Sequence, residues 1–266
     1  MTPAELIGQN DLVGALASAT NAVRANPADP KQRLLLAQLN CVLSRWEKAL
    51  DQFALYASLS SDADSRIRAR LAQVAVQCEV FREEVFAGRR TPLLFGEPEP
   101  WLGWLVESVH LLSKNKNDAA AALRDKAFEE APTAKGKIDG RPFEWLADAD
   151  TRLGPVLELF MEGKYYWVPF NRIRRVAIDP PVDLCDLVFL PAQFKWVNGG
   201  EGAGYIPVRY SAPQRETNSD PRFALSRMTD WTELPGTFVV GTGQRMLATD
   251  AEEVSLLETR IIDFEE

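Results

Sequence analysis

The stretch Asp11-Leu12-Val13-Gly14-Ala15-Leu16 returns 34 residues later as Arg45-Trp46-Glu47-Lys48-Ala49-Leu50. Both stretches place a small alanine immediately before a leucine, and each is followed by apolar residues at helical spacing. The alanine lets two paired helices approach each other closely. We therefore interpret the front of the chain as a set of paired helices built on an internal repeat.

The length of this repeat points to a known architecture. Thirty-four residues is the period of the tetratricopeptide repeat, a helix–turn–helix unit that stacks into a curved array. Such arrays present a concave surface that usually binds another protein. The repeat therefore favours a protein-binding role over a catalytic one.

Helix signals surround the repeat on both sides. Thr2, Pro3 and Glu5 form a capping box with proline at the first helical position. Asn26–Pro30 contains two prolines, which end a helix. The expected helices cover 3–8, a segment that begins at 11, 31–43, 46–58 and 65–87. A third, irregular helix pair is expected after the proline-rich stretch 91–100.

The expected helix over 65–87 carries the longest apolar stripe, in which steps of four and three residues alternate. Its members are Ile67, Leu71, Val74, Cys78, Phe81 and Val85. Because the apolar face of a helix usually packs on the core, we expect this stripe to contact neighbouring repeats. A coiled coil with another chain is the alternative, although only about three heptads are present.

The character of the sequence changes beyond Gly163. A last helix is expected near 143–162, and Gly154-Pro155 could break it. Downstream, short runs rich in aromatic and branched residues alternate with turn residues, which is typical of strands. These runs are 165–168, 174–178, 187–190, 194–197, 205–209, 238–240, 245–248 and 259–264. The polar stretch 211–221 is expected to form a loop.

The predicted fold class is therefore α+β. We expect a tetratricopeptide-like helical domain over 1–135, a helical junction over 136–163 and a compact, mostly β domain over 164–266.

Composition excludes several classes of function. A net charge of −8 argues against a dominant nucleic-acid surface, which needs clustered lysine and arginine. No apolar run is long enough to cross a membrane and no signal peptide is present, so we expect a cytoplasmic protein without a membrane partner. The three cysteines, Cys41, Cys78 and Cys185, lack the spacing of a disulfide framework or zinc site. The oligomeric state is left open.

Glu144, Asp148 and Asp150 form an acidic cluster, in which Glu144 and Asp148 would share a helix face. Paired carboxylates can perform acid–base chemistry or hold a divalent ion, so a metal-assisted hydrolase is one alternative. Arg141 and Arg152 offer a simpler interpretation, namely ion pairs that fix the domain junction. Partner binding is a third possibility. We expect no catalytic, cofactor-binding or metal-binding residues and no cofactor.

Two other features are interpreted as structural. The single histidine, His110, lies in an apolar helix, and no GxSxG elbow accompanies it. The glycine-rich stretch 198–204 lacks the Lys-Ser/Thr of a phosphate-binding loop and is flanked by strand-like residues, so we expect a hairpin turn.

Aromatic residues gather near the expected junction. Most tryptophans are expected in the core, but tryptophan is also a favoured residue at binding hot spots. The candidate partner-binding residues are Trp101, Trp104, Glu144, Trp145, Asp148, Asp150, Tyr166 and Trp167.

Several stretches together resemble one family. They are Gly96–Trp101, Asp139–Glu158 (DGRPFEWLADADTRLGPVLE), Gly163–Phe170 (GKYYWVPF), Asn198–Glu201, Ile206–Tyr210 (IPVRY) and Gly243–Ala248 (GQRMLA). The chain resembles the ImpE/SciE/TagJ family of accessory proteins of bacterial type VI secretion over nearly its whole length. Val208 stands where that family has threonine.

The resemblance implies a non-catalytic accessory protein without a cofactor. Its implied partners are a helix of the small sheath subunit and, indirectly, the AAA+ ATPase that recycles contracted sheath. No catalytic residue of the family is carried over. A generic tetratricopeptide scaffold outside secretion is the remaining alternative, and it predicts that the β half is dispensable.

Overall fold

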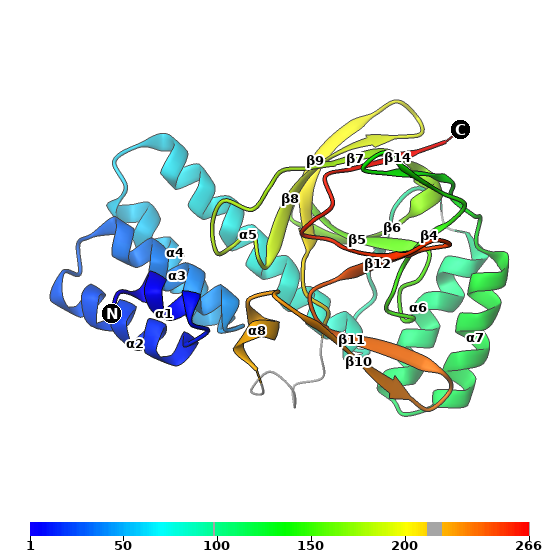
Figure 1. Ribbon diagram of the computed structural model, residues 1–266, viewed down its shortest axis with the longest axis horizontal. Helices are drawn as coiled ribbons and strands as arrows, with labels where there is room; N and C mark the ends of the chain where they lie inside the picture. Colours follow the sequence, from blue (N-terminus) through cyan, green and yellow to red (C-terminus); the bar gives the residue numbers. More distant parts are fainter. Residues whose placement is uncertain (98, 212–219, 266) are drawn as a thin grey trace.

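The computed structural model describes residues 1–97, 99–211 and 220–265, and its fold is α+β (Figure 1). The chain begins with five consecutive helices, each packed against the next. They are α1 (Pro3–Gly8), α2 (Leu12–Ala25), α3 (Pro30–Val42), α4 (Trp46–Leu59) and α5 (Ala63–Phe86). The helices expected from the sequence are present at these positions, and none is long and apolar enough to cross a membrane among the described residues.

Local sequence explains where these helices start. Thr2 caps α1 in the expected capping box with Glu5. The carboxylates of Asp11 and Asp62 cap α2 and α5 by accepting hydrogen bonds from backbone amides of the first turn. Ala15 is fully buried, which agrees with the close helix approach that the repeat predicted.

The apolar stripe of α5 is only partly buried, so the prediction for it was wrong at one end. Cys78 and Val85 are buried, whereas Ile67 is 56% and Leu71 45% exposed. Figure 1 shows the reason: α5 crosses from the helices to the strands, and its first turns lie beyond the sheet. The buried part of the stripe packs on the sheet rather than on other repeats, and Phe81 contacts the ring of Tyr165.

A third helix pair follows, as expected. It consists of α6 (Pro100–Ser113) and α7 (Asn117–Glu130), and it lies at the opposite end of the molecule from α1–α4 (Figure 1). Ala120 of α7 forms a small core with Phe238 and Val240 of the hairpin β10 (Thr229–Leu234) and β11 (Phe238–Gly243).

A curved nine-stranded sheet forms most of the rest of the molecule, with strand order β1-β6-β5-β9-β8-β7-β14-β2-β3. A three-stranded sheet, β13-β12-β4, packs beside it around a shared core. The strands are β1 (Leu93–Leu94), β2 (Gly136–Ile138), β3 (Arg141–Phe143), β4 (Leu146–Asp148), β5 (Val156–Met161), β6 (Lys164–Pro169), β7 (Ile173–Ile178), β8 (Phe189–Trp196), β9 (Glu201–Pro207), β12 (Met246–Thr249), β13 (Glu253–Ser255) and β14 (Ile261–Phe264). A 3₁₀ turn, Phe170–Arg172, separates β6 from β7.

The helix expected near 143–162 does not exist, and the expected helical junction over 136–163 is formed by strands instead. Residues 146–148 pair with β12, and β5 pairs along its whole length with β6. Apolar spacing in this stretch is compatible with a helix, but pairing with distant strands overrides that local preference.

The turns follow the sequence more closely. Gly199, at φ +84°, lies in the turn of the β8–β9 hairpin, as expected for the glycine-rich stretch. The two short strands expected at 187–190 and 194–197 merge into the single strand β8. Most of the expected loop 211–221 lies outside the described residues.

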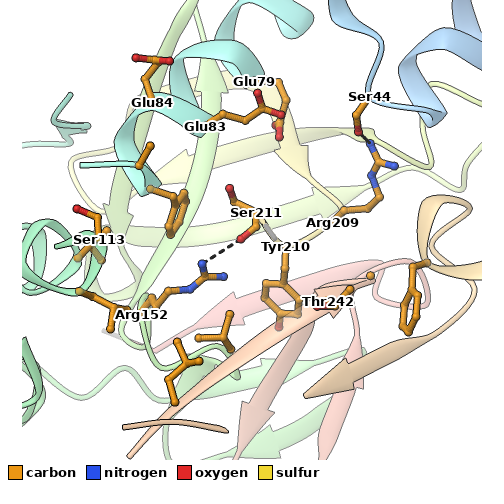
Figure 2. Close-up of a pocket in the computed structure, with 18 of the residues that line it drawn as sticks. Ser44, Glu79, Glu83, Glu84, Ser113, Arg152, Arg209, Tyr210, Ser211 and Thr242 are labelled. Carbon is orange, nitrogen blue, oxygen red and sulfur yellow. Dashed lines mark hydrogen bonds between the residues drawn. The ribbon is translucent and has the colours of Figure 1, made fainter. Parts of the chain in front are cut away.

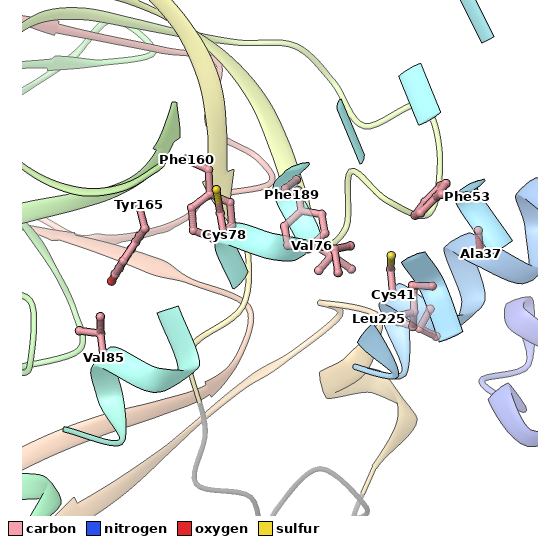
Figure 3. Close-up of a cluster of buried hydrophobic side chains, with 14 of the residues drawn as sticks. Ala37, Cys41, Phe53, Val76, Cys78, Val85, Phe160, Tyr165, Phe189 and Leu225 are labelled. Carbon is pink, nitrogen blue, oxygen red and sulfur yellow. The ribbon is translucent and has the colours of Figure 1, made fainter. Parts of the chain in front are cut away.

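The chain covers one side of its own helical array. The short helix α8 (Pro221–Ala224) precedes Leu225, which is buried in the same core as Ala37 and Cys41 of α3 (Figure 3). Figure 3 also shows that this core continues through Val76 of α5 to Phe189 of β8. Part of the surface that a helical array could offer to a ligand is therefore occupied by the chain itself.

Candidate functional site

The predicted acidic cluster separates into buried and exposed members. Asp148, the last residue of β4, and Asp150, two residues further along the chain, are both buried. The side chain of Glu144 is 67% exposed and pairs with Lys135. Glu144 and Asp148 do not share a helix face, because the stretch that contains them is formed by strands and turns. Arg141 pairs with Glu252 on the surface rather than with the cluster.

Each buried aspartate has an arginine partner. Arg152 Nη2 lies 2.5 Å from Asp150 Oδ2, and Arg245 pairs with Asp148. These contacts support the simpler interpretation of the cluster as ion pairs at the junction. They leave no convergent, vacant carboxylate oxygens of the kind that a divalent ion needs.

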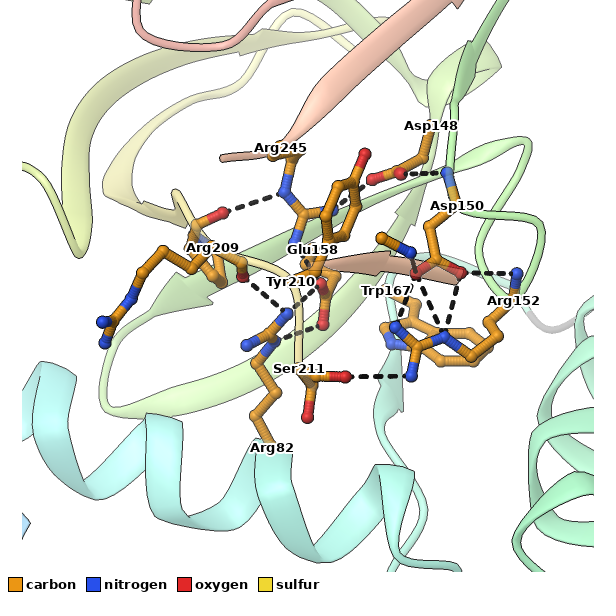
Figure 4. A network of polar contacts seen from close by, with 12 residues as sticks. Arg82, Asp148, Asp150, Arg152, Glu158, Trp167, Arg209, Tyr210, Ser211 and Arg245 are labelled. Atoms are coloured by element: carbon orange, nitrogen blue, oxygen red, sulfur yellow. Dashed lines mark hydrogen bonds and ion pairs between the residues drawn. The ribbon is translucent and has the colours of Figure 1, made fainter. Parts of the chain in front are cut away.

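Asp148 belongs to a buried chain of charges that joins helix to sheet (Figure 4). Arg82 of α5 donates from Nε and Nη2 to Glu158 of β5 at 2.7 and 2.8 Å. It also pairs with Glu79 at 2.9 Å. Arg245 then connects Glu158 to Asp148. We call these five residues the junction network.

Burial shifts the two central carboxyl groups in opposite directions. Desolvation raises the pKa of Asp148 to about 6, although Arg245 opposes this shift. Desolvation would also raise the pKa of Glu158, but the guanidinium groups of Arg82 and Arg245 outweigh it and lower that pKa to about 2. Glu158 is therefore the fixed anion of the network.

The motif Ile206–Tyr210 connects α3 and β12 beside this network. Arg209 donates to the carbonyl of Val42 at 2.7 Å and to that of Cys41 at 3.3 Å, at the end of α3. A guanidinium is well suited to this end of a helix, where unpaired carbonyls carry partial negative charge. Tyr210 bonds through its hydroxyl to the backbone of Met246 on β12.

A cleft of about 1110 Å³ opens in front of Arg209 and Tyr210 (Figure 2). Its walls come from the α3–α4 turn, the last turns of α5, the α6–α7 turn, the residues around α8 and the hairpin β10–β11. Apolar side chains form much of its lining, including Trp46, Phe86, Leu112 and Val240. The cleft is therefore built from both helical parts of the chain, the α8 region and the β10–β11 hairpin.

Among the described residues that line the cleft, Glu83 is the only one with a carboxylate that forms no ion pair. It is half-buried, and it accepts a hydrogen bond of 2.8 Å from Trp46 Nε1. Burial raises the pKa of Glu83. Glu84, the next residue, pairs with Arg89 at 2.6 Å.

The cationic side chains in the cleft wall are mostly committed to the protein itself. Arg152 binds Asp150 and the carbonyl of Ser211, and Arg209 binds backbone carbonyls. The lining thus combines apolar surface with one available carboxylate. Chemically, this arrangement can bind an apolar segment and a positive charge.

None of the eight predicted partner-binding residues lines this cleft. Trp101, Trp167, Asp148 and Asp150 are buried and cannot contact a partner in this conformation. Four predicted residues stay accessible: Tyr166 and Trp104 are half-buried, and Glu144 and Trp145 are exposed. Lys126 covers the ring of Trp104 at 3.7 Å, so that ring is partly shielded as well.

The other expected structural roles agree with the geometry. Trp167 donates a hydrogen bond of 2.6 Å to Tyr165, whose hydroxyl in turn contacts Glu158. His110 is half-buried on α6 and contacts Lys114. Within residues 1–97, 99–211 and 220–265, no group of three histidine, cysteine, aspartate or glutamate residues could hold a metal ion.

Sequence reasoning missed the cleft and the junction network because their residues are distant in the chain. Arg82 lies on α5, Glu158 on β5 and Arg245 between β11 and β12, and no local spacing links them. The available signal was the repeated presence of charged residues inside apolar strands, such as Glu158 within Val156–Met161.

Comparison with known proteins agrees with this architecture. A model of the family described as "ImpE protein" matches residues 140–263. The chain is 39% identical over 267 residues to a Pseudomonas aeruginosa protein named "Type VI secretion system accessory component TagJ", and the alignment covers 100% of this chain and 92% of that protein. The crystal structure of protein VPA1032 from Vibrio parahaemolyticus has the same fold, with a TM-score of 0.88, 22% identity and coverage of 99% of this chain and 97% of that one. Because the 39% identity to the Pseudomonas protein extends over the whole of this chain, the chain belongs to the ImpE/TagJ family.

Proposed function

We propose that this protein is a non-catalytic adaptor of bacterial type VI secretion, which binds a segment of the small sheath subunit in the cleft between its helices and strands. The family supports an accessory role in type VI secretion, since the Pseudomonas relative carries that name. The observation that carries the proposal is the cleft itself, whose lining combines apolar and polar side chains and includes, among the described residues, a single carboxylate that forms no ion pair.

The size of the cleft is sufficient for a peptide segment. Small-molecule pockets usually enclose roughly 300 to 1000 Å³, and this cleft reaches about 1110 Å³. Apolar anchors with a polar rim are the usual composition of a groove that holds a helix or an extended segment. We further propose that the bound sheath subunit links the protein to the AAA+ ATPase that recycles contracted sheath, and that the protein acts in the cytoplasm.

The metal-assisted hydrolase is the weaker alternative. It needs Glu144, Asp148 and Asp150 to converge, but Asp148 and Asp150 are engaged with arginines and Glu144 lies on the surface. The generic scaffold outside secretion is also less favoured, because its β half would be dispensable while here that half forms one wall of the cleft.

Direct binding to the purified small sheath subunit of a type VI system from the same organism tests the proposal. We expect the complex to be detected by isothermal titration calorimetry and to be lost in Ala87→Trp, which fills the cleft beside the end of α5. Ala17→Trp, at an exposed site on α2 outside the cleft lining, is the matched control and should bind normally. Absence of binding by the wild-type protein would refute the sheath adaptor role, and equal loss in both variants would refute the cleft as its site.

A further inference from the structure

We infer that the segment that docks in the cleft carries an arginine or lysine which pairs with Glu83. This inference rests on the proposed protein-binding role of the cleft and specifies the chemistry of the partner. It starts from Glu83, a half-buried carboxylate that forms no ion pair with any of the described residues.

The charges around the back of the cleft do not balance. Those that meet there are the carboxylates of Glu79, Glu83, Asp148 and Glu158 and the guanidinium groups of Arg82, Arg209 and Arg245. Asp150 and Arg152 neutralise each other. Apart from the exposed Arg45, whose charge would complete the balance, this set has one negative charge left over, and Glu83 is its carboxylate without an arginine partner.

The position of Glu83 is suited to a ligand rather than to water alone. Trp46 fixes the carboxylate through its indole N–H at 2.8 Å, which leaves further lone pairs of the carboxylate for another donor. Figure 2 shows Glu83 on the α5 wall, across the cleft from Arg152 and Tyr210. Arg82 and Arg209 stabilise the Glu83 carboxylate only through longer-range attraction. A guanidinium or ammonium group from a partner, in direct contact, would offset more of its desolvation cost.

An acidic segment fits the same cleft poorly. The guanidinium groups of Arg152 and Arg209 already donate to protein acceptors, so neither is free to receive a carboxylate. Arg45 also belongs to the cleft lining, but it is exposed, so solvent weakens its attraction for an anion. Apolar side chains of the same cleft lining, such as Phe86 and Leu112, supply surface that would bury the stem of a long basic residue.

Selection from a random-peptide library displayed on phage tests the inference without any sheath protein. The immobilised wild-type protein should enrich peptides that combine apolar residues with arginine or lysine. Fluorescence anisotropy with an enriched peptide should show affinity at least tenfold weaker for Glu83→Gln, since one charge-assisted contact is lost. Glu84→Gln is the matched control. It removes the same charge from the neighbouring residue, but the carboxylate of Glu84 already pairs with Arg89. The affinity of this variant for the peptide should change less than threefold.

The outcomes separate the inference from the proposed function. Enrichment of acidic or uncharged peptides, failure to enrich any peptide, or equal affinity of the wild type and Glu83→Gln would overturn the inference. Thermal melts of both variants establish that any loss of binding is not a loss of fold. Binding of basic peptides at Glu83 without any binding of the sheath subunit would instead overturn the sheath adaptor role and leave the chemistry of the cleft intact.

Discussion

At the scale of single residues, the most consequential side chain is Glu158. It is completely buried, and it lies between the guanidinium groups of Arg82 and Arg245. Its charge costs free energy to desolvate, but its removal would leave two cations without their shared partner. The network therefore makes the contact between α5 and the sheet specific, because no other described carboxylate binds both arginines.

We predict that Glu158→Gln lowers the free energy of unfolding by roughly 3–5 kcal/mol, the usual cost of breaking a buried ion pair from one side. Urea unfolding followed by circular dichroism measures the change. Glu129→Gln, at an exposed site on α7, is the control and should change stability by less than about 0.5 kcal/mol. A loss below about 1 kcal/mol in Glu158→Gln would contradict the role assigned to this residue.

Asp148 should give the protein an unusual pH dependence. Its pKa is raised from 3.8 to about 6, so the native state holds this proton more tightly than the unfolded state does. Between pH 4 and 6 the contribution of Asp148 to stability therefore decreases as the pH rises. Glu158 acts in the opposite sense, and its contribution is lost as the pH falls from 4.5 towards about 2.

Asp148→Asn separates these two contributions. We predict that, between pH 4 and 6, the free energy of unfolding of this variant decreases less with rising pH than that of the wild type, because Asp148 no longer titrates there. Urea titrations at several pH values in this range provide the measurement. Parallel curves for wild type and variant would show that Asp148 does not hold a raised pKa.

At the scale of elements, the helices could be predicted from the sequence because their signals are local. Caps such as Asp11, prolines at helix starts and a stripe at helical spacing all lie within one element. The stretch 143–162 could not, because its strands are defined by partners such as β12, about a hundred residues away. The candidate site could not be predicted for the same reason, because Glu83 shares the cleft lining with residues of α4, α6 and the β10–β11 hairpin that are distant in the sequence.

The stripe of α5 offers a test within one element. Val85 is 3% exposed, whereas Leu71 lies where the helix extends beyond the sheet. We predict that Val85→Ala costs about 2 kcal/mol through lost burial and a residual cavity, and that Leu71→Ala changes stability by less than about 0.5 kcal/mol. Chemical denaturation of both variants checks this difference, and equal losses would show that the exposed end of the stripe is covered in solution.

At the scale of the whole molecule, helices and strands share one core. The largest apolar cluster includes Leu12 of α2, Val76 of α5, Trp101 of α6 and Phe189 of β8. Arg209 and the junction network add polar contacts across the same boundary. The cleft exists only where these units meet, so the binding surface and the integrity of the fold depend on the same contacts.

This shared core predicts that the protein unfolds in one cooperative step. Far-UV circular dichroism reports mainly on the helices, and tryptophan fluorescence reports largely on α6 and the strands, where most tryptophans lie. The two signals should change at the same urea concentration. Arg82→Met should lower both midpoints together, since Arg82 joins α5 to β5. Two separate transitions, with only one of them sensitive to Arg82, would show instead that the helical array is an independent scaffold whose β half is dispensable.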